Sequence, residues 1–251
     1  ITGWKKKYRI KDESHSKDKK IIISLTSFPA RIGKVWLTVE SLLRQKMKPD
    51  MIILWLSKEQ FPGMGSLPNR LLNLQKRGLV IRLMNGDIRS YKKYQYTIEE
   101  YPDATIILAD DDFIYDTDLV SSLMQAHVEE PHVVCARYGY RMKRENDGQI
   151  SSYLKWPSIT EPTPASSEVF FGSGGGTLFT RSMMHKDLSN IKLARELRPT
   201  ADDIYLNAMA RLRNTKIRFV SGKYVLAQIS IENNVTLAST NIGKICQNDI
   251  Q

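Results

Sequence analysis

The amino-acid sequence predicts an α/β fold of the Rossmann-like, doubly wound kind, with a mostly parallel sheet in a single domain. Short, continuous apolar runs recur through the first half of the chain, as in strands that are covered on both faces. Segments with helical spacing separate these runs, and such alternation is typical of βαβ units. With 251 residues, the chain is long enough for one continuous core.

The first half alternates strand and helix in order. The spacing of Val35, Val39 and Leu42 predicts a helix after the first apolar run. Gly78 marks the end of a later helix, because glycine commonly closes helices. We expect strands at 21–25, 51–56, 79–83 and 104–109, and helices at 35–43, 70–75 and 90–100.

The second half is less regular, and no linker marks a second domain. Strands are expected at 132–137 and 216–221, and a helix at 201–211. Residues 151–164 are rich in Ser, Pro and Thr, so a loop is expected there.

The formal net charge of the chain is +10, and eight Lys or Arg residues lie before residue 21. We interpret residues 1–20 as a basic leader, either solvated and disordered or in contact with an anionic membrane surface. Residues 21–251 form the expected domain. A basic balance also suits nucleic acid or a polyanionic small substrate, and composition does not choose among these.

The two cysteines, Cys135 and Cys246, are too far apart to suggest a disulfide framework or a zinc site. Cys135 lies in an apolar run and is expected to be buried. No apolar run approaches the roughly 20 residues of a membrane span, and no secretory signal is visible. These features favour a cytoplasmic location, with or without peripheral contact to the inner face of the membrane.

Three carboxylates, Asp110, Asp111 and Asp112, directly follow the apolar run at 104–109. Adjacent carboxylates repel one another, and a hard divalent cation such as Mg²⁺ or Mn²⁺ removes that repulsion. The alternative is a solvated turn or a helix N-cap. Polar clusters at 26–27 and 85–87 follow two other expected strands. Ligands of such sheets bind beyond the carboxyl ends of the strands, so the position favours the metal site.

Several blocks of the sequence resemble a group of bacterial surface and capsular polysaccharide glycosyltransferases of the GT-A superfamily. The resemblance runs from residue 21 to the end of the chain, and its blocks are specific together rather than singly. In chain order they are 22–32, 41–45, 53–57, 60–62, 91–93, 109–112, 202–206 and 248–249.

The resemblance implies an Asp-x-Asp motif that holds a metal ion and the diphosphate of a nucleotide-sugar donor. Asp112 would bind the Mn²⁺ or Mg²⁺ directly, and Asp110 would contact the donor and share the ion. Asp111 would support the donor side as a structural partner. Many GT-A enzymes add a late His ligand, whereas no His follows His185 here. A late Asn, a water or a phosphate oxygen would complete the shell.

Further donor contacts are implied at the ends of the other strands. Thr26 and Ser27 would read the nucleoside, and Arg31 would pair with a phosphate. Asp87 would hydrogen-bond the uracil ring. The alternative for these positions is turn and N-cap chemistry. Of two neighbouring lysines only one should face the site, and we expect Lys93 to contact the diphosphate, with a solvated Lys as the alternative.

Asp202 and Asp203 open the helix expected at 201–211. In inverting enzymes of this kind an acidic residue at the start of such a helix acts as general base. The resemblance therefore implies that Asp203 takes a proton from the acceptor hydroxyl and that Asp202 binds or orients the acceptor. The alternative is an N-cap with favourable charge at the positive helix end.

Two features of the second half bear on sugar binding. Trp156 lies in the expected polar loop, where its face would stack on a sugar ring, unless it packs in the core. Gly174, Gly175 and Gly176 either let the backbone approach the sugar closely or form a plain flexible turn.

The predicted function is transfer of a sugar from a UDP-sugar to a hydroxyl of a glycan or lipid-linked saccharide, with inversion, in surface polysaccharide biosynthesis. One alternative is a nucleotidyltransferase that makes a nucleotide sugar, although residues 26–29 lack a Gly-rich, basic loop. The other is a non-enzymatic nucleic-acid-binding protein, suggested by the charge. No helix-turn-helix, zinc or RNA-binding signature supports it, so nucleic acid is not an expected partner.

Overall fold

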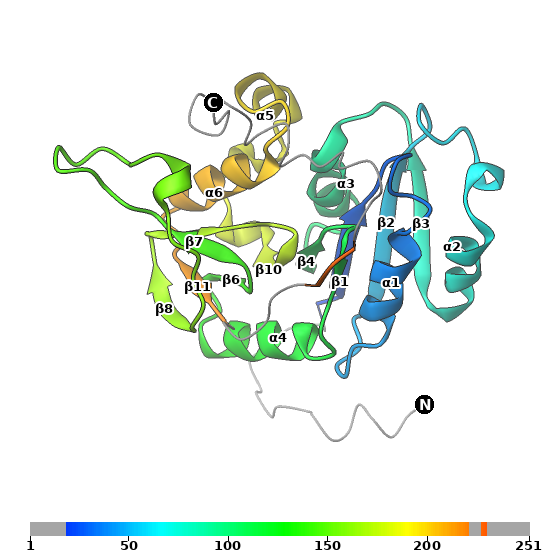
Figure 1. Ribbon diagram of the computed structural model, residues 1–251, viewed down its shortest axis with the longest axis horizontal. Coiled ribbons are helices and arrows are strands. Elements are labelled where there is room, and N and C mark those ends of the chain that lie inside the picture. Colours follow the sequence, from blue (N-terminus) through cyan, green and yellow to red (C-terminus); the bar gives the residue numbers. More distant parts are fainter. Residues whose placement is uncertain (1–18, 221–226, 230–251) are drawn as a thin grey trace.

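The computed structural model describes residues 19–220 and 227–229, which form one α/β domain around a central sheet (Figure 1). The strands of that sheet are β1 (Ile21–Thr26), β2 (Met51–Ser57), β3 (Leu79–Met84), β4 (Thr105–Ala109), β6 (Val134–Ala136), β8 (Thr163–Ser166), β10 (Gly175–Thr180) and β11 (Ile217–Phe219). They lie in the order β3-β2-β1-β4-β10-β6-β11-β8. Two small sheets pair β5 (Phe113–Ile114) with β12 (Ala227–Gln228), and β7 (Gly139–Arg141) with β9 (Val169–Phe171).

The order of the strands creates a switch point beside β1. The strand β1 pairs in parallel with β2 on one side and with β4 on the other, and β2 pairs in parallel with β3. The chain therefore builds outward from β1 to β3 and then returns to place β4 against β1. Doubly wound sheets bind ligands at the carboxyl ends of strands where the order reverses in this way.

Helices cover both faces of the sheet (Figure 1). They are α1 (Val35–Leu43), α2 (Asn69–Asn73), α3 (Lys92–Glu100), α4 (Leu119–Glu129), α5 (Ile191–Leu197) and α6 (Asp202–Leu212). Side chains of α1, α2 and α4 share one buried cluster with Ile23 and Ile107. Those of α3, α5 and α6 share the other with Ile22 and Ile106. Neighbouring residues of a strand point to opposite faces, so each apolar run contributes to both clusters.

The predicted fold class is confirmed, and the expected elements are present with small differences in their ends. The helix predicted at 70–75 is α2, followed by a 3₁₀ turn (Leu74–Arg77) that ends at Gly78 with φ of 111°. Cys135 is buried, as expected for a small apolar side chain.

The structure corrects two expectations for the second half. The glycine run is not a flexible turn, because it leads into β10, which lies between β4 and β6 and is antiparallel to both. Glycine has low strand propensity, so the glycines at the start of β10 did not indicate a strand, although Thr177 and Phe179 after them favour one. The predicted loop at 151–164 holds a 3₁₀ turn (Tyr153–Lys155) and the first residues of β8.

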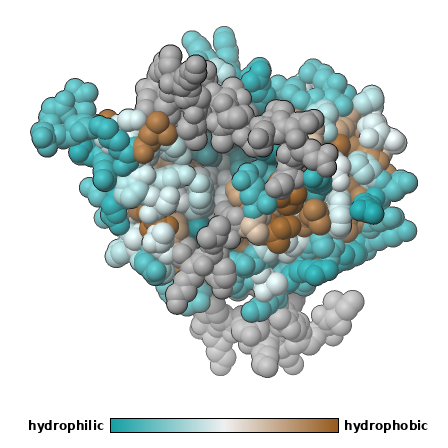
Figure 2. Space-filling view, in the orientation of Figure 1, coloured by the Kyte–Doolittle hydropathy of each residue, from teal (hydrophilic) through white to brown (hydrophobic). Residues whose placement is uncertain are grey.

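The basic leader up to residue 18, Cys246 and the 248–249 block lie outside the described residues. Among the residues that are described, no helix is both long and apolar enough to cross a bilayer. The face seen in Figure 2 is largely hydrophilic, with hydrophobic side chains gathered in small separate patches.

Candidate functional site

The candidate site lies at the switch point, where β1 and β4 end beside each other. Asp110, Asp111 and Asp112 directly follow β4, and Ser27 and Arg31 follow β1. The parallel register of the two strands brings these segments together, although more than 70 residues separate them in the chain. The three carboxylates point to different partners, and this separates their roles.

Asp111 is the buried structural member of the run. Its carboxylate accepts hydrogen bonds from Ser27 Oγ at 2.5 Å and from Arg31 Nη1 at 2.7 Å, and its backbone oxygen accepts from Thr38 Oγ1 at 2.9 Å. Burial raises the pKa of Asp111 to about 6, although Arg31 and Ser27 oppose the shift. These bonds tie the loop after β1 and the helix α1 to the end of β4.

Asp112 contacts the small sheet formed by β5 and β12. Its Oδ2 lies 3.1 Å from Arg31 Nη1 and accepts a hydrogen bond from Gln228 Nε2 at 2.9 Å. The backbone oxygen of Asp112 accepts from Ile229 N at 2.7 Å, next to the pairing of β5 with β12. Burial raises the pKa of Asp112, and the charge of Asp110 raises it further, so the two carboxylates lie close enough to repel each other.

Asp110 is the accessible member, with 39% of its side chain exposed. Its Oδ1 accepts a hydrogen bond from Lys93 Nζ at 2.7 Å. Its backbone N–H bonds to Tyr115 Oη at 2.8 Å and to Gly174 O at 3.2 Å. Tyr115 and Gly174 thereby hold the backbone of Asp110 in place at the end of β4.

Gly174 is required by the side chain of Asp110. A Cβ built on Gly174 would lie 1.8 Å from both Cγ and Oδ2 of Asp110, so no larger residue fits without moving that carboxylate. Gly175 and Gly176 are buried in β10, and Gly176 has φ of 99° at a register shift of the strand. Gly174 thus leaves room for the Asp110 carboxylate, and Gly176 adopts a backbone conformation that favours glycine.

We expect Gly174→Ala to lower the free energy of unfolding by about 1–3 kcal/mol, because overpacking displaces Asp110 from its ion pair with Lys93. Urea denaturation measures this. Gly65→Ala is the matched control, because nothing lies within 4 Å of a Cβ at Gly65. Equal stability of the two variants would contradict the tight contact.

Lys93 connects the aspartates after β4 with those on α6. Its Nζ lies 2.7 Å from Asp110 Oδ1 and 3.0 Å from Asp202 Oδ2, and 3% of its side chain is exposed. Burial lowers the pKa of Lys93, but Asp110, Asp202 and Asp203 together outweigh burial and raise it above the usual value. Lys93 is therefore not solvated. Its neighbour Lys92 is also buried and binds Asp87, so the expectation that only one of the two lysines faces the site does not hold.

The two carboxylates at the start of α6 are held by Ser173. Ser173 Oγ donates to Asp202 Oδ2 at 3.0 Å, and Ser173 N donates to Asp203 Oδ1 at 2.9 Å. Asp202 is buried and ion-paired with Lys93, whereas Asp203 is only partly buried. Burial and the charge of Asp202 raise the pKa of Asp203 to about 7. A carboxyl group with such a pKa exchanges protons near neutral pH.

Two other predicted donor contacts, Asp87 and Thr26, lie at the carboxyl ends of β3 and β1. Asp87 follows β3, and Lys92 Nζ and Gln60 Nε2 bind its carboxylate, the latter at 2.8 Å. The net effect lowers the pKa of Asp87, because burial is outweighed by the bonds from Lys92 and from Arg89 N. Thr26 Oγ1 donates to the Trp55 carbonyl at 2.8 Å at the end of β1.

Trp156 is partly buried in a cluster of aromatic rings rather than in either main core. Its Nε1 donates to the Ser151 carbonyl at 2.9 Å, and its ring centroid lies 5.2 Å from Tyr153 and 5.3 Å from Phe170. The structure does not bring the ring into contact with the aspartates.

The residues present are compatible with a divalent cation. Asp110 and Asp112 repel each other, and Mg²⁺ is usually bound by one or two carboxylates together with waters and substrate phosphates. In the part of the chain that the structure describes, no group of three or more His, Cys, Asp or Glu side chains is arranged for a metal. Such an ion would therefore take further ligands from a phosphate or water.

Sequence reasoning missed several residues that complete the site: Ser173, Tyr115, Gln60 and Gln228. Ser173 lies inside the glycine run and Tyr115 follows the aspartates closely, so proximity to motifs was an available signal. Gln228 gave no signal, because its bond to Asp112 spans 116 residues.

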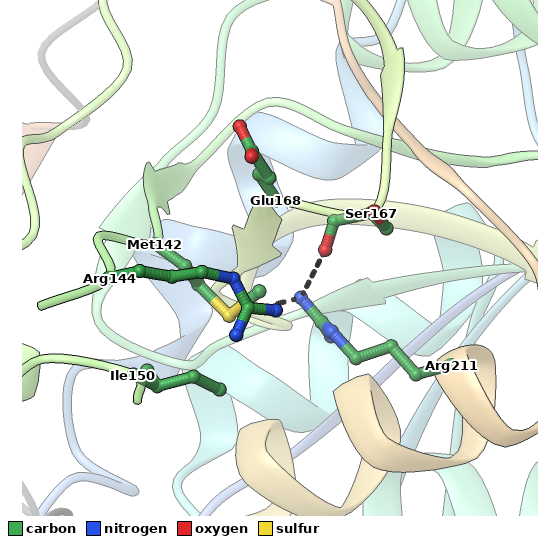
Figure 3. A pocket seen from close by; sticks show the side chains of 6 residues that line it. All are labelled: Met142, Arg144, Ile150, Ser167, Glu168 and Arg211. Carbon is green, nitrogen blue, oxygen red and sulfur yellow. Dashed lines mark hydrogen bonds between the residues drawn. The ribbon is translucent and has the colours of Figure 1, made fainter. Parts of the chain in front are cut away.

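A cleft of about 140 Å³ lies elsewhere, between the segment after β7, the turn from β8 to β9 and the end of α6 (Figure 3). It is lined by Met142, Arg144, Ile150, Ser167, Glu168 and Arg211. Arg211 Nη2 donates to the carbonyls of Ser167 and Val169 at 3.1 and 2.9 Å. Burial lowers the pKa of Arg211 to about 10. Through these bonds Arg211 stabilises the turn between β8 and β9. None of the predicted site residues lines this cleft.

Comparison with known proteins shows the fold. No family model matches the chain, and no curated protein matches it. A 4-diphosphocytidyl-2C-methyl-D-erythritol synthase from Anaerococcus prevotii is similar with a TM-score of 0.56 and 15% identity, over 89% of this chain and 98% of that one. A second synthase of this name gives a TM-score of 0.50 at 10% identity, over 90% and 100%.

The 1–349 part of S. aureus TarS is also similar, with a TM-score of 0.55 and 12% identity. The match covers 81% of this chain and 58% of the TarS chain. At these identities the likeness establishes a shared Rossmann-like α/β fold, and the chemistry has to be argued from the site.

Proposed function

We propose that this protein is a metal-dependent glycosyltransferase. It moves a sugar from a UDP-sugar to a hydroxyl of a glycan or lipid-linked saccharide in surface polysaccharide biosynthesis, in the cytoplasm or at the inner face of the membrane. The observation that carries the proposal is the meeting of two acidic pairs at the switch point. Asp110 and Asp112 follow β4, Asp202 and Asp203 open α6, and Lys93 lies between the pairs.

The pair on α6 supplies what a sugar acceptor needs. A hydroxyl group becomes a good nucleophile only when a base removes its proton, and a carboxylate with a pKa near 7 suits that task at neutral pH. Asp203, with a pKa raised to about 7, is that base. Asp202 is held by Lys93 and Ser173, so we assign it to positioning.

The pair after β4 faces the leaving group. When bound, a divalent ion neutralises charge on the departing diphosphate. Asp112 and Asp110 would hold it, and Lys93 and Arg31 place further positive charge beside them. The acceptor oxygen bonds to the anomeric carbon as the bond to the diphosphate oxygen breaks, and the hydroxyl proton goes to Asp203. A single displacement of this kind inverts the anomeric configuration, and NMR of the product linkage tests it. Retention would exclude Asp203 as the base.

Asp112→Asn is expected to weaken Mn²⁺ binding by roughly tenfold or more, because an amide replaces a charged oxygen ligand. Electron paramagnetic resonance of free Mn²⁺, titrated with the protein and UDP, measures this. Asp103→Asn is the control, because Asp103 is exposed and remote from the run. Unchanged Mn²⁺ affinity in the Asp112 variant would remove it as a ligand.

The proposed function is tested by a panel of nucleotide sugars with Mn²⁺, scored by release of the nucleoside diphosphate. We expect turnover with at least one UDP-sugar and none after chelation with EDTA. No turnover with any donor, and no effect of metal, would overturn the proposal.

A nucleotidyltransferase is the second candidate, because the two synthases with this fold are enzymes of that class, whereas TarS is a glycosyltransferase. The presence of a candidate base, Asp203, favours glycosyl transfer over nucleotidyl transfer. A sugar phosphate is largely ionised at pH 7 and needs no base to act as nucleophile, so Asp203 would have no task. Release of pyrophosphate from a nucleoside triphosphate and a sugar 1-phosphate would identify the second candidate.

A further inference from the structure

Four aromatic side chains gather into a cluster that we call the aromatic platform: Tyr138, Tyr140, Tyr153 and Trp156. Consecutive ring centroids are 5.6, 5.2 and 5.2 Å apart, and each pair meets edge to face. Phe170 of β9 is buried and packs against Tyr153 and Trp156, with centroids 5.9 and 5.3 Å away. The pairing of β7 with β9 brings Tyr140 to Phe170, and the bridge between Tyr140 and Ser158 brings the segment with Tyr153 and Trp156 alongside. The platform is therefore a fixed feature of the fold.

The platform lies beside Asp203. The N–H of Gly172 donates to Tyr138 O at 3.0 Å, and the N–H of the next residue, Ser173, donates to Asp203 Oδ1 at 2.9 Å. A Cβ on Gly172 would lie 2.4 Å from Tyr138 Cδ1, so the ring lies against the glycine backbone. Burial and the Tyr140 hydroxyl raise the pKa of Tyr138, and Asp203 and Asp110 raise it further, which places both carboxylates within electrostatic range of its hydroxyl.

We propose that the aromatic platform binds a pyranose ring of the acceptor, adjacent to the hydroxyl that Asp203 deprotonates; this rests on the proposed function. Tyrosine and tryptophan combine an apolar face with a polar edge, as a sugar ring does. Tyr138 is 38% exposed, and its hydroxyl lies 2.6 Å from that of Tyr140, so the pair presents hydrogen-bonding groups beside the rings. The bond from Trp156 Nε1 to Ser151 O fixes the indole in place.

Charge decides which saccharides suit the platform. Asp203 lies next to the platform, because Ser173 N, which follows Gly172, donates to its carboxylate, and that carboxylate would repel a carboxylate on the ligand. The ligand is therefore a neutral or N-acetylated pyranose rather than a uronic acid.

Saturation-transfer NMR on the full chain tests the inference with a mixture of methyl pyranosides (glucoside, galactoside, mannoside and N-acetylglucosaminide) and with methyl glucuronide. We expect saturation of the aromatic protons to reach at least one neutral glycoside and to spare the glucuronide. Tyr138→Ala and Trp156→Ala should each weaken that signal by roughly five- to tenfold. Tyr138→Phe should keep part of it, because the ring remains against Gly172.

Leu154→Ala is the matched control, since Leu154 lies in the same 3₁₀ turn as Tyr153 and is 61% exposed. It should bind the glycoside as the unchanged protein does. No glycoside signal, or a signal that survives both ring deletions, would overturn the inference, and so would loss of UDP binding in the ring variants. UDP-sugar turnover is scored separately. Turnover without glycoside binding defeats only this inference, and glycoside binding without turnover defeats only the proposed function.

Discussion

Replacing Asp203 with Asn is expected to reduce the rate of sugar transfer by about 10²- to 10⁴-fold while donor binding is retained, because an amide does not accept the acceptor proton. The substitution preserves shape, so the backbone bond from Ser173 N to Oδ1 remains possible. Steady-state kinetics should show the loss in kcat with the KM for the donor unchanged. Glu196→Gln on α5 is the control, because Glu196 is exposed.

The unchanged protein should show the protonation of Asp203 in its pH profile. Burial and Asp202 raise the pKa of Asp203 to about 7, with Lys93 opposing the shift and Asp110 adding to it. The active form of a base is the deprotonated one, so kcat/KM is low at pH 5, rises with pH and levels off above about 8. A flat profile from pH 5 to 8, or an Asn variant with more than a tenth of the original rate, would contradict the assignment.

Replacing Lys93 with Met is expected to lower the free energy of unfolding by about 3–5 kcal/mol, because removing one partner leaves buried charge without compensation. Lys93 is 3% exposed and contacts both Asp110 and Asp202, and Asp202 has 7% of its side chain exposed. Urea denaturation measures the loss. Lys76→Met is the control, because Lys76 is exposed at the end of a 3₁₀ turn.

A second substitution tests the cause of that loss. In the double variant Lys93→Met with Asp202→Asn, the uncompensated carboxylate at Asp202 is also removed. Part of the stability should return, and the double-mutant cycle should show a coupling of about 0.5–3 kcal/mol. Strict additivity of the two changes would mean that the ion pair does not hold the two acidic pairs together.

Lys93 also shows where sequence reasoning stopped. Helical spacing predicted that only one of two neighbouring lysines faces the site, but the structure buries both of them, Lys92 against Asp87 and Lys93 against Asp110. The role assigned by resemblance was a diphosphate contact. In the structure Lys93 binds Asp110 and Asp202, and the partner on α6 lies 109 residues away in the chain. Its contact with a diphosphate stays a prediction.

The sequence by itself determined the fold class, most of the strands and the polar clusters at their ends. A continuous apolar run is a local signal, because a strand whose two faces are both buried needs apolar side chains at every position. The same signal placed Asp110, Asp111 and Asp112 at the end of β4, and helical spacing placed Asp202 and Asp203 at the start of α6.

Only the tertiary structure decided which of these clusters meet. The return of β4 to the side of β1 brings Arg31 to Asp111 and Asp112, and β10 brings Ser173 to Asp203. The two glycines that begin β10 have low strand propensity, and the aromatic platform combines rings from two segments that pack on Phe170 of a third. Contacts of this kind depend on packing between elements distant in the chain, and no local pattern of residues encodes them.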